Sequence, residues 1–193
     1  MSLQLMTPPS IEPVTLEEAK AHLKVDTSDD DDLIARNIAS ARVRIELHLG
    51  RALITQSWIQ WLDCWPANGI IEVSLPPLQS VTSITTYAPD NTPTVLDLAT
   101  YQVDAVSQPG RIVFDYELIA PLTPEFVTGL RRANAIAIAF TAGYGNAATD
   151  VPSPIREALL EIVAFLYEHR GEAPDEMPSS ALALLSPYRI FNL

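Results

Sequence analysis

The sequence has little cysteine, little glycine, little positive charge and no long apolar run. Its single cysteine, Cys64, excludes an internal disulfide framework and fits a reducing compartment. Twelve lysines and arginines stand against 24 aspartates and glutamates, and the formal net charge of −12 argues against broad binding to phosphates. No apolar run is long enough to span a bilayer, and the first ten residues lack the regions of a signal peptide.

The chain nevertheless has enough apolar sequence to build a core. Of its 193 residues, 48% are hydrophobic, and the mean hydropathy is +0.13, which is typical of one domain or of one domain with an insertion. The surplus of negative charge favours solubility and suits a surface that nucleic acid passes without sticking. Sixteen prolines against seven glycines predict rather stiff connections.

A helix over residues 152–170 has the clearest ends, and the rest of the chain is organised around it. Ser153 is expected to cap this helix, Pro154 to occupy its first position, and Gly171 to end it. Its apolar residues recur at three- and four-residue spacing and predict one buried face, made of Ile155, Leu159, Ile162 and Leu166. We expect this helix to close a helical body.

Two further helices are expected near the N-terminus, after an extended arm over residues 1–13. The first begins at a capping box, in which the Thr15 hydroxyl accepts from the Glu18 N–H and the Glu18 carboxylate accepts from the Thr15 N–H. The aspartates at 26–32 lack the glycine and glutamate of an EF-hand loop, so they indicate a helix start rather than a calcium site. The second helix follows at about 30–49, with a buried stripe of Ile34, Ile38, Ala41, Ile45 and Leu49.

Between the helices, the hydrophobic period changes from helical to alternating, which indicates β-strands. The expected strands lie near 53–62, 70–75, 81–87, 101–104, 111–115 and 134–141. Turn sequences rich in proline, asparagine and glycine separate them, and short strands with frequent turns favour an antiparallel sheet or a small sandwich.

The predicted fold class is therefore α+β. It consists of a helical body, with two N-terminal helices and one long C-terminal helix, interrupted by an antiparallel β insertion. The expected divisions are an N-terminal arm and helices over 1–50, the β insertion over 51–143, the closing helix over 144–171, and a linker with an apolar tail over 172–193.

No grouping of residues predicts catalysis, a cofactor or a metal ion. Cys64 lies between Trp61 and Trp65, which favours a buried small side chain over a nucleophile. The stretch 143–145 is too short for a dinucleotide loop and predicts a tight exit from a strand. No carboxylate spacing supports a metal site at any of the widely separated histidines, which are His22, His48 and His169.

The last segment is apolar at a terminus that would normally fray. Such a tail needs a surface, and the sequence leaves open whether its own domain or a partner supplies it. If it docks on a partner, the expected anchors are Leu185, Pro187, Tyr188, Arg189, Ile190 and Phe191.

Six stretches of the sequence together form a pattern that goes beyond single motifs. They are Val14–Asp26, Gly50–Trp58, Pro76–Val81, Phe140–Gly145, Val151–Pro152 and Leu185–Arg189. In this order and spacing they resemble the gp6-like head–tail connector family of long-tailed bacteriophages and prophages, whose longer members carry a β region between the helices. The resemblance covers nearly the whole chain, although residues 116–134 match nothing that can be placed.

The resemblance implies a structural virion protein without catalysis or cofactor. Such connectors form a ring, typically twelvefold, beneath the portal protein, extend the DNA channel and link the head to a tail or stopper protein. DNA would pass through without specific binding, and the protein would sit at the head–tail junction after assembly in the cytoplasm of the host bacterium. The helices expected to build the ring wall would use Ile34, Ile38, Ile45, Ile155, Leu159, Ile162 and Leu166.

The alternative interpretation is a DNA-packaging or DNA-binding accessory protein of a phage or prophage. Such a protein needs a basic face, because clustered cations on the protein displace the counterions of the phosphates. The candidate arginines are Arg36, Arg42, Arg44, Arg131 and Arg132.

Overall fold

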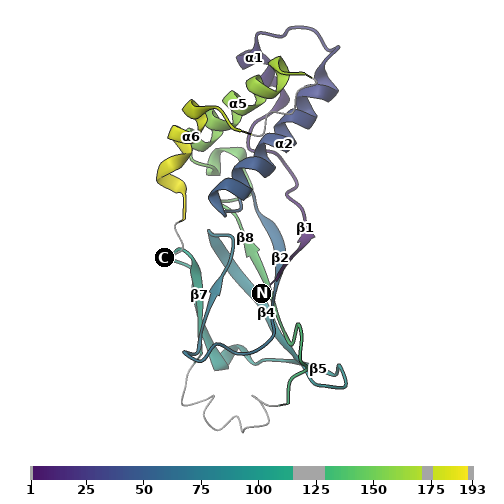
Figure 1. The fold of residues 1–193 in the computed structure, drawn as a ribbon, viewed down its shortest axis with the longest axis vertical. Coiled ribbons are helices and arrows are strands. Elements are labelled where there is room, and N and C mark those ends of the chain that lie inside the picture. Colours follow the sequence, from purple (N-terminus) through teal and green to yellow (C-terminus); the bar gives the residue numbers. More distant parts are fainter. Residues whose placement is uncertain (1, 115–128, 171–175, 191–193) are drawn as a thin grey trace. The chain divides into compact units, whose positions relative to one another are not determined.

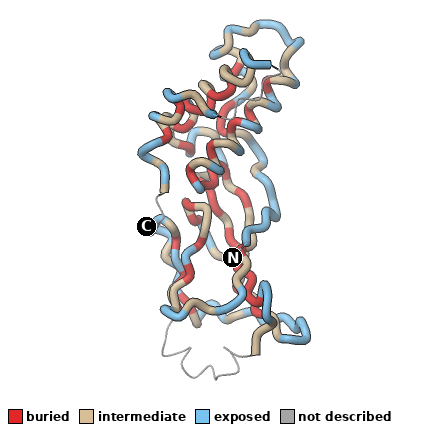
Figure 2. Tube along the Cα trace, in the orientation of Figure 1, coloured by how far each residue is buried: buried red, intermediate tan, exposed pale blue. Residues whose placement is uncertain are grey.

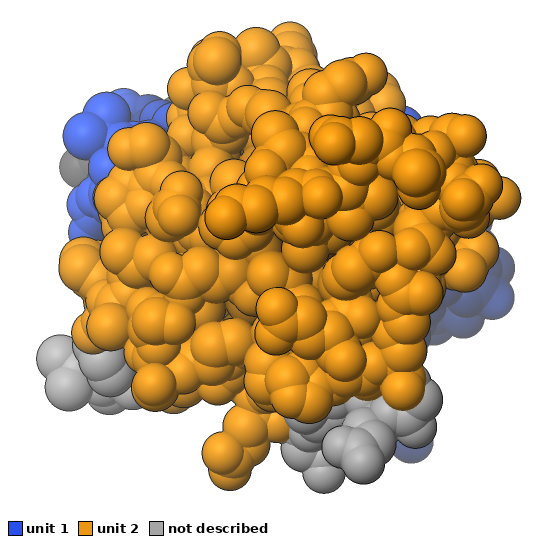
Figure 3. Space-filling view, turned by 90° about the horizontal axis from the view of Figure 1, so that it is seen from above, with its two compact units in different colours: residues 1–8, 55–143 blue, residues 9–54, 144–193 orange. Residues whose placement is uncertain are grey.

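A computed structural model describes residues 2–114, 129–170 and 176–190. The chain divides into two compact units, which Figure 3 shows in different colours. Unit 1 consists of residues 1–8 and 55–143, and unit 2 of residues 9–54 and 144–193. Among the described helices, none combines the length and the apolar character needed to cross a bilayer.

Unit 1 contains two antiparallel sheets (Figure 1). The five-stranded sheet has the order β1-β2-β8-β4-β5, with β1 at Ser2–Thr7, β2 at Gln56–Leu62, β8 at Ile136–Ala142, β4 at Leu78–Tyr87 and β5 at Pro93–Val95. The three-stranded sheet has the order β3-β7-β6, with β3 at Ile70–Val73, β7 at Gly110–Phe114 and β6 at Tyr101–Asp104. A short 3-10 helix, η1, spans Leu98–Thr100.

The core of unit 1 lies along the central strand β8. Ile136, Ile138 and Phe140 are buried, as their alternation with alanines predicts. Beside them on β2, the fully buried Gln60 donates to the Glu72 carbonyl oxygen and accepts from the Ser74 N–H, both at 2.9 Å. These two bonds satisfy the buried amide and connect the two sheets of the unit.

Unit 2 is helical, and its core comes from both ends of the chain, whose colours can be followed in Figure 1, while Figure 2 shows the buried parts in red. Its helices are α1 at Leu16–Leu23, α2 at Asp31–Leu49, α5 at Ser153–Glu168 and α6 at Ser179–Leu185, with short 3-10 helices η2 at Ala148–Asp150 and η3 at Ser186–Tyr188. Apolar residues on each of the four α-helices described for this unit enter one core, together with Leu53, Ile54 and Val151 from the connections.

The local signals at the start of unit 2 are confirmed. Thr15 caps α1, and its hydroxyl accepts from the Glu18 N–H at 3.1 Å while the Glu18 carboxylate accepts from the Thr15 N–H at 2.8 Å. The predicted stripe of α2 is buried along its whole length. Because a fixed spacing along one helix is enough to define such a stripe, the sequence alone could predict it.

At α5 the predicted face is buried, but the predicted cap is wrong. Pro152 occupies the capping position and Ser153 is the first helical residue, with no side-chain bond to the helix end. Pro152 has no side-chain acceptor, and its carbonyl oxygen accepts from the Ile155 N–H at 3.0 Å and from the Arg156 N–H at 3.2 Å. The predicted stop at Gly171 lies outside the described residues.

Three further expectations concern loops and edges. Gly143 follows β8 with a φ of 128°, which confirms the tight exit from a strand. Cys64 is exposed, so the expectation of a buried cysteine is wrong; it lies in the loop after β2 rather than in a strand. The N-terminal segment predicted as an extended arm is in part a strand, β1. The short strand β5 has no clear signal in the sequence.

The fold class is confirmed as a mixed fold of helices and antiparallel sheets.

Candidate assembly surfaces

Surfaces that could bind another protein are the candidate sites in this chain. Within residues 2–114, 129–170 and 176–190, no group of three or more histidine, cysteine, aspartate or glutamate side chains could hold a metal ion. The candidate surfaces are the C-terminal tail, the outward face of α2, the hairpin between β6 and β7, and the charged side chains.

The C-terminal tail is part of unit 2 as far as Tyr188. Ala181 and Leu185 on α6 are fully buried in the core of the unit, and Leu184 and Tyr188 pack against that core. At η3 the buried Arg51 donates from Nε to the Tyr188 carbonyl oxygen at 2.6 Å. Because a buried guanidinium needs an acceptor, this bond holds the end of the tail against the C-terminal end of α2.

The six expected anchors of the tail therefore have different environments. Leu185 is enclosed in unit 2, Pro187 and Arg189 are exposed, and Tyr188 and Ile190 are half-buried. Burial and the positive charge of Arg189 lower the pKa of His48, which places Arg189 beside α2. The sixth anchor, Phe191, lies outside the described residues.

The residues expected to form a ring wall face inward in unit 2. Ile34, Ile38, Ile45, Ile155, Leu159 and Ile162 are buried in its core, and Leu166 packs against that core. In this arrangement they hold α2 and α5 together, and the six buried side chains have no surface to offer a neighbour. A contact between copies would have to use the other faces of the same helices.

The outward face of α2 carries two exposed apolar side chains one helical turn apart. Val43 is 43% exposed and Leu47 is 79% exposed. Arg36 and Ser40 continue this exposed line towards the start of the helix. The helical period marks the buried stripe and passes over Val43 and Leu47, although large apolar residues off the stripe of an amphipathic helix are a signal of a contact surface.

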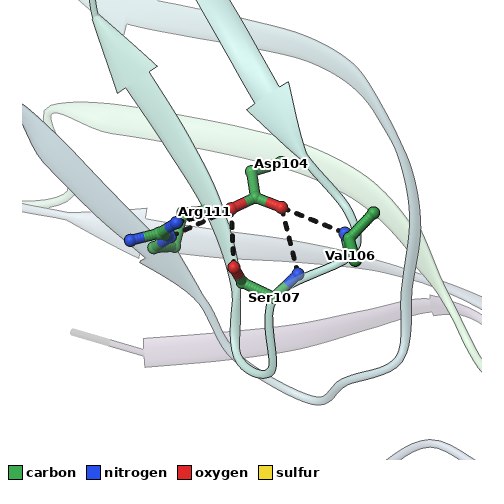
Figure 4. Close-up of polar contacts among 4 residues, drawn as sticks. All are labelled: Asp104, Val106, Ser107 and Arg111. Atoms are coloured by element: carbon green, nitrogen blue, oxygen red, sulfur yellow. Dashed lines mark hydrogen bonds and ion pairs between the residues drawn. The ribbon is translucent and has the colours of Figure 1, made fainter.

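The hairpin between β6 and β7 holds an exposed valine at a fixed turn (Figure 4). The Asp104 carboxylate accepts from the Val106 N–H at 3.1 Å, the Ser107 N–H at 3.0 Å and the Ser107 hydroxyl at 2.6 Å. Arg111 donates to the same carboxylate at 2.6 Å. The Ser107 hydroxyl and then the Arg111 guanidinium hold the pKa of Asp104 well below its usual range. Val106, at 92% exposed, is thereby presented on a well-bonded turn.

The aspartate-rich stretch serves unit 2 internally, in agreement with a helix start. Asp30 is the residue before α2, and it accepts from the Tyr167 hydroxyl at 2.5 Å and from Arg170 at 2.7 Å. Arg170 and then Tyr167 lower the pKa of Asp30. Asp31 pairs with Lys20 at 2.6 Å. These contacts join α1, α2 and the end of α5.

Two of the five arginines considered for a DNA-binding face are engaged within the fold. Arg42 donates to Glu12 at 2.7 Å and to Glu46 at 2.8 Å. Arg131 donates to the Asn134 carbonyl oxygen and lies 4.2 Å from the centre of the Tyr87 ring. Such contacts satisfy the guanidinium groups internally.

Residues 13–102 match the family described as phage gp6-like head–tail connector protein. This part of the chain is similar to the connector family. The resemblance drawn from the sequence motifs is confirmed, and with it the structural role of a head–tail connector. The motifs at 140–145, 151–152 and 185–189 lie outside the matched residues.

Solved structures share the fold of this chain over all of its residues. A chain from "Neck of empty GTA particle computed with C6 symmetry" aligns with a TM-score of 0.80 and 21% identity. A chain from "Virion of native gene transfer agent (GTA) particle" aligns with a TM-score of 0.80 and 20% sequence identity. A chain from "Neck of native GTA particle computed with C12 symmetry" aligns with a TM-score of 0.78 and 19% sequence identity. Each alignment covers 100% of this chain and 97% of the other. No curated protein matches the chain.

Proposed function

We propose that this connector forms a ring of about twelve subunits beneath the portal of a phage or phage-like particle, extends the DNA channel and links the head to the tail. The observation that carries the proposal is the full-length likeness to a neck chain of a GTA particle, one example of which was computed with C12 symmetry. The scaffold would be the helical body of α1, α2 and α5, which the β region interrupts in the chain order.

A closed ring needs two different patches on each subunit, because its contacts are heterologous. We assign one of them to the outward face of α2, where Val43 and Leu47 are exposed. Burying a leucine side chain that is mostly exposed contributes roughly 1–2 kcal/mol per contact. This free energy is modest for one pair of subunits, but the contributions add up around a ring in which every subunit makes the same contact.

The surplus of acidic side chains suits the inner wall of a DNA channel. With a net charge of −12 per chain, a ring repels the phosphates of the DNA rather than releasing their counterions. Arg42 and Arg131 are engaged internally, which reduces the cationic surface further. We therefore propose that DNA passes through this ring without binding to it.

The portal contact is assigned to the end of the C-terminal tail. Leu185 stays in the core of unit 2, whereas Pro187 and Arg189 are exposed and Ile190 is half-buried. Pro187 and Arg189 flank Tyr188, whose carbonyl oxygen accepts from Arg51, and Ile190 and Phe191 follow in the sequence. We propose that this segment enters a groove of the portal, anchored by its apolar side chains.

The experiment that tests this function is co-assembly with the portal encoded in the same phage or prophage. Size exclusion with light scattering, followed by negative-stain imaging, should show one ring of this chain added to the narrow end of the portal. Leu47→Glu should raise the concentration needed for assembly about tenfold, since about 1.4 kcal/mol per contact corresponds to that factor. The matched control is Leu98→Glu, at a leucine 67% exposed in η1 of unit 1.

Two results would contradict the proposal at different levels. If both proteins are folded and no complex forms at any salt concentration, the connector does not sit beneath this portal. If the complex forms and Leu47→Glu behaves like Leu98→Glu, the outward face of α2 is not a ring contact. Tight, salt-dependent binding of DNA near physiological salt would instead favour a DNA-binding accessory role.

A further inference from the structure

The strand β1 is held to unit 1 by pairing with one other strand. It lies at the edge of the five-stranded sheet and pairs antiparallel with β2, from Ser2 opposite Trp61 to Thr7 opposite Ser57 (Figure 1). All six of its residues are exposed. Its side chains therefore bury little area, and ladder bonds supply most of its attachment. One side-chain bond adds to them, from Trp61 Nε1 to Gln4 Oε1 at 3.1 Å.

The covalent path from β1 to β2 runs through the other unit. Residues 9–54, which connect these two strands, belong to unit 2. The chain is fixed there from Glu12 onwards, because Arg42 donates to Glu12 at 2.7 Å and Arg156 donates to the Pro13 carbonyl oxygen at 2.9 Å. Unlike β6 and β7, which a hairpin joins, β1 has no short loop that ties it to the β2 of its own chain.

The segment between β1 and this attachment is short and stiff. It contains Pro8 and Pro9, whose rings favour an extended backbone, and Ser10 and Ile11 are exposed. Five steps of at most about 3.6 Å separate Thr7 from Glu12, which gives a reach of about 18 Å. Strand β1 is therefore joined to unit 2 by a short linker, and it can pair with any β2 strand that lies within this reach.

We propose that in the assembled ring β1 of one copy pairs with β2 of the neighbouring copy. The inference rests on the ring proposed above. The β2 of a neighbour offers the same ladder partners and the same Trp61 indole for Gln4, so the exchange loses no contact. Which β2 is used depends on effective concentration, and a ring holds a second β2 at a fixed spacing.

The exchange also fits the chemistry of the strand and the symmetry of a ring. The sequence SLQLMT of β1 carries no charge, so no charged group is transferred to a new environment. Each copy gives one strand and receives one, which is a heterologous contact that closes with the ring. A full ladder would then reinforce the contact that Val43 and Leu47 make on α2.

The test uses a pair of cysteines at opposite positions of the ladder. Gln4 lies opposite Ile59, and side chains at such positions have Cβ atoms about 4.5–5.5 Å apart, within reach of a short bis-maleimide and close to disulfide geometry. Cys64→Ser supplies the background, because the native thiol is exposed. Chains with Gln4→Cys alone and chains with Ile59→Cys alone are mixed, assembled with the portal and cross-linked.

Exchange predicts covalent dimers from this mixture on a denaturing gel. The double variant Gln4→Cys with Ile59→Cys should give a ladder of oligomers up to the whole ring, with loss of most of the monomer band. The matched control, Gln4→Cys with Thr94→Cys, places the second thiol on β5 at the other edge of the sheet and should give no cross-link.

The outcomes separate the exchange from the ring itself. If rings form by light scattering but the mixture stays monomeric and the double variant links within one chain, the exchange is wrong and the ring stands. If no ring forms but the mixture gives dimers at high concentration, β1 pairs with the β2 of another copy outside a ring, and both the proposed ring and exchange within it fail. A chain that remains monomeric throughout and links only within itself overturns both.

Discussion

Truncating Leu185 to alanine tests whether the C-terminal tail is part of the fold of unit 2. Leu185 is fully buried in the same core as Ala181 and the apolar face of α5. Replacing a buried leucine by alanine costs about 2–5 kcal/mol, because transfer free energy is lost and a cavity remains. Since α6 has only seven residues at the margin of the core, we expect about 3 kcal/mol. For a chain of this size, that corresponds to a fall in Tm of about 6–12 °C.

The measurement is thermal and urea unfolding of the full chain, followed by far-UV circular dichroism. Ser186→Ala is the control, because Ser186 is exposed and adjacent, and it should change stability by less than about 0.5 kcal/mol. The same variants are then tested for binding to the portal. If Leu185→Ala unfolds like Ser186→Ala and loses portal binding, Leu185 is an anchor for the partner and the burial argument fails.

Three further predictions concern contacts inside each unit. Thr15→Ala should lower the free energy of unfolding by about 1 kcal/mol, because α1 loses its cap, and Thr15→Ser should restore most of it. Arg42→Met should lower the free energy of unfolding by roughly 1–3 kcal/mol, because the Glu46 carboxylate loses its charged donor. An unchanged urea concentration at the midpoint of unfolding would refute this prediction. The pKa of Asp104 is lower in the folded chain than in the unfolded chain. The ionised carboxylate therefore stabilises the hairpin fully at pH values above the ordinary aspartate pKa of about 3.9. This stabilisation is lost as the pH falls towards the lowered pKa of the folded state. The NMR shift of the Val106 amide should therefore stay constant down to about pH 4, and a titration midpoint above that would contradict the contact.

Features that depend on a few neighbouring residues could be predicted from the sequence. The capping box of Thr15 and Glu18 needs a spacing of three, and the stripe of α2 needs the helical period, so both follow from local chemistry. The strand predicted at 101–104 has the observed bounds of β6, and the turn sequence Pro109-Gly110 follows it.

Features that depend on distant partners could not be predicted in the same way. Strand β1 forms because β2 lies beside it, although the two are separated by the whole of residues 9–54. The exposure of Cys64 follows from the end of β2 at Leu62, and flanking tryptophans suggest burial instead. Tertiary pairing overrides local pattern in both cases.

The candidate surfaces were predicted less well than the fold. Periodicity marks which residues of α2 and α5 are apolar, but a buried stripe supports the core and leaves the partner-facing residues unmarked. Val43 and Leu47 stand out only once the opposite face of α2 is known to be buried. Likewise, the apolar character of Leu185 fits an intramolecular core and a partner groove equally, and packing decides between them.

The division of the helical core between the two ends of the chain has a consequence for biosynthesis. When the ribosome has completed β8 at Ala142, the last of the described strands has been made, whereas about 50 residues of the helical unit remain to be translated. Ala181 and Leu185 are among the last of these, so a prematurely terminated polypeptide leaves the apolar faces of α2 and α5 uncovered. Translation thus reaches the described strands before α6, and only a chain that includes α6 covers these faces of α2 and α5.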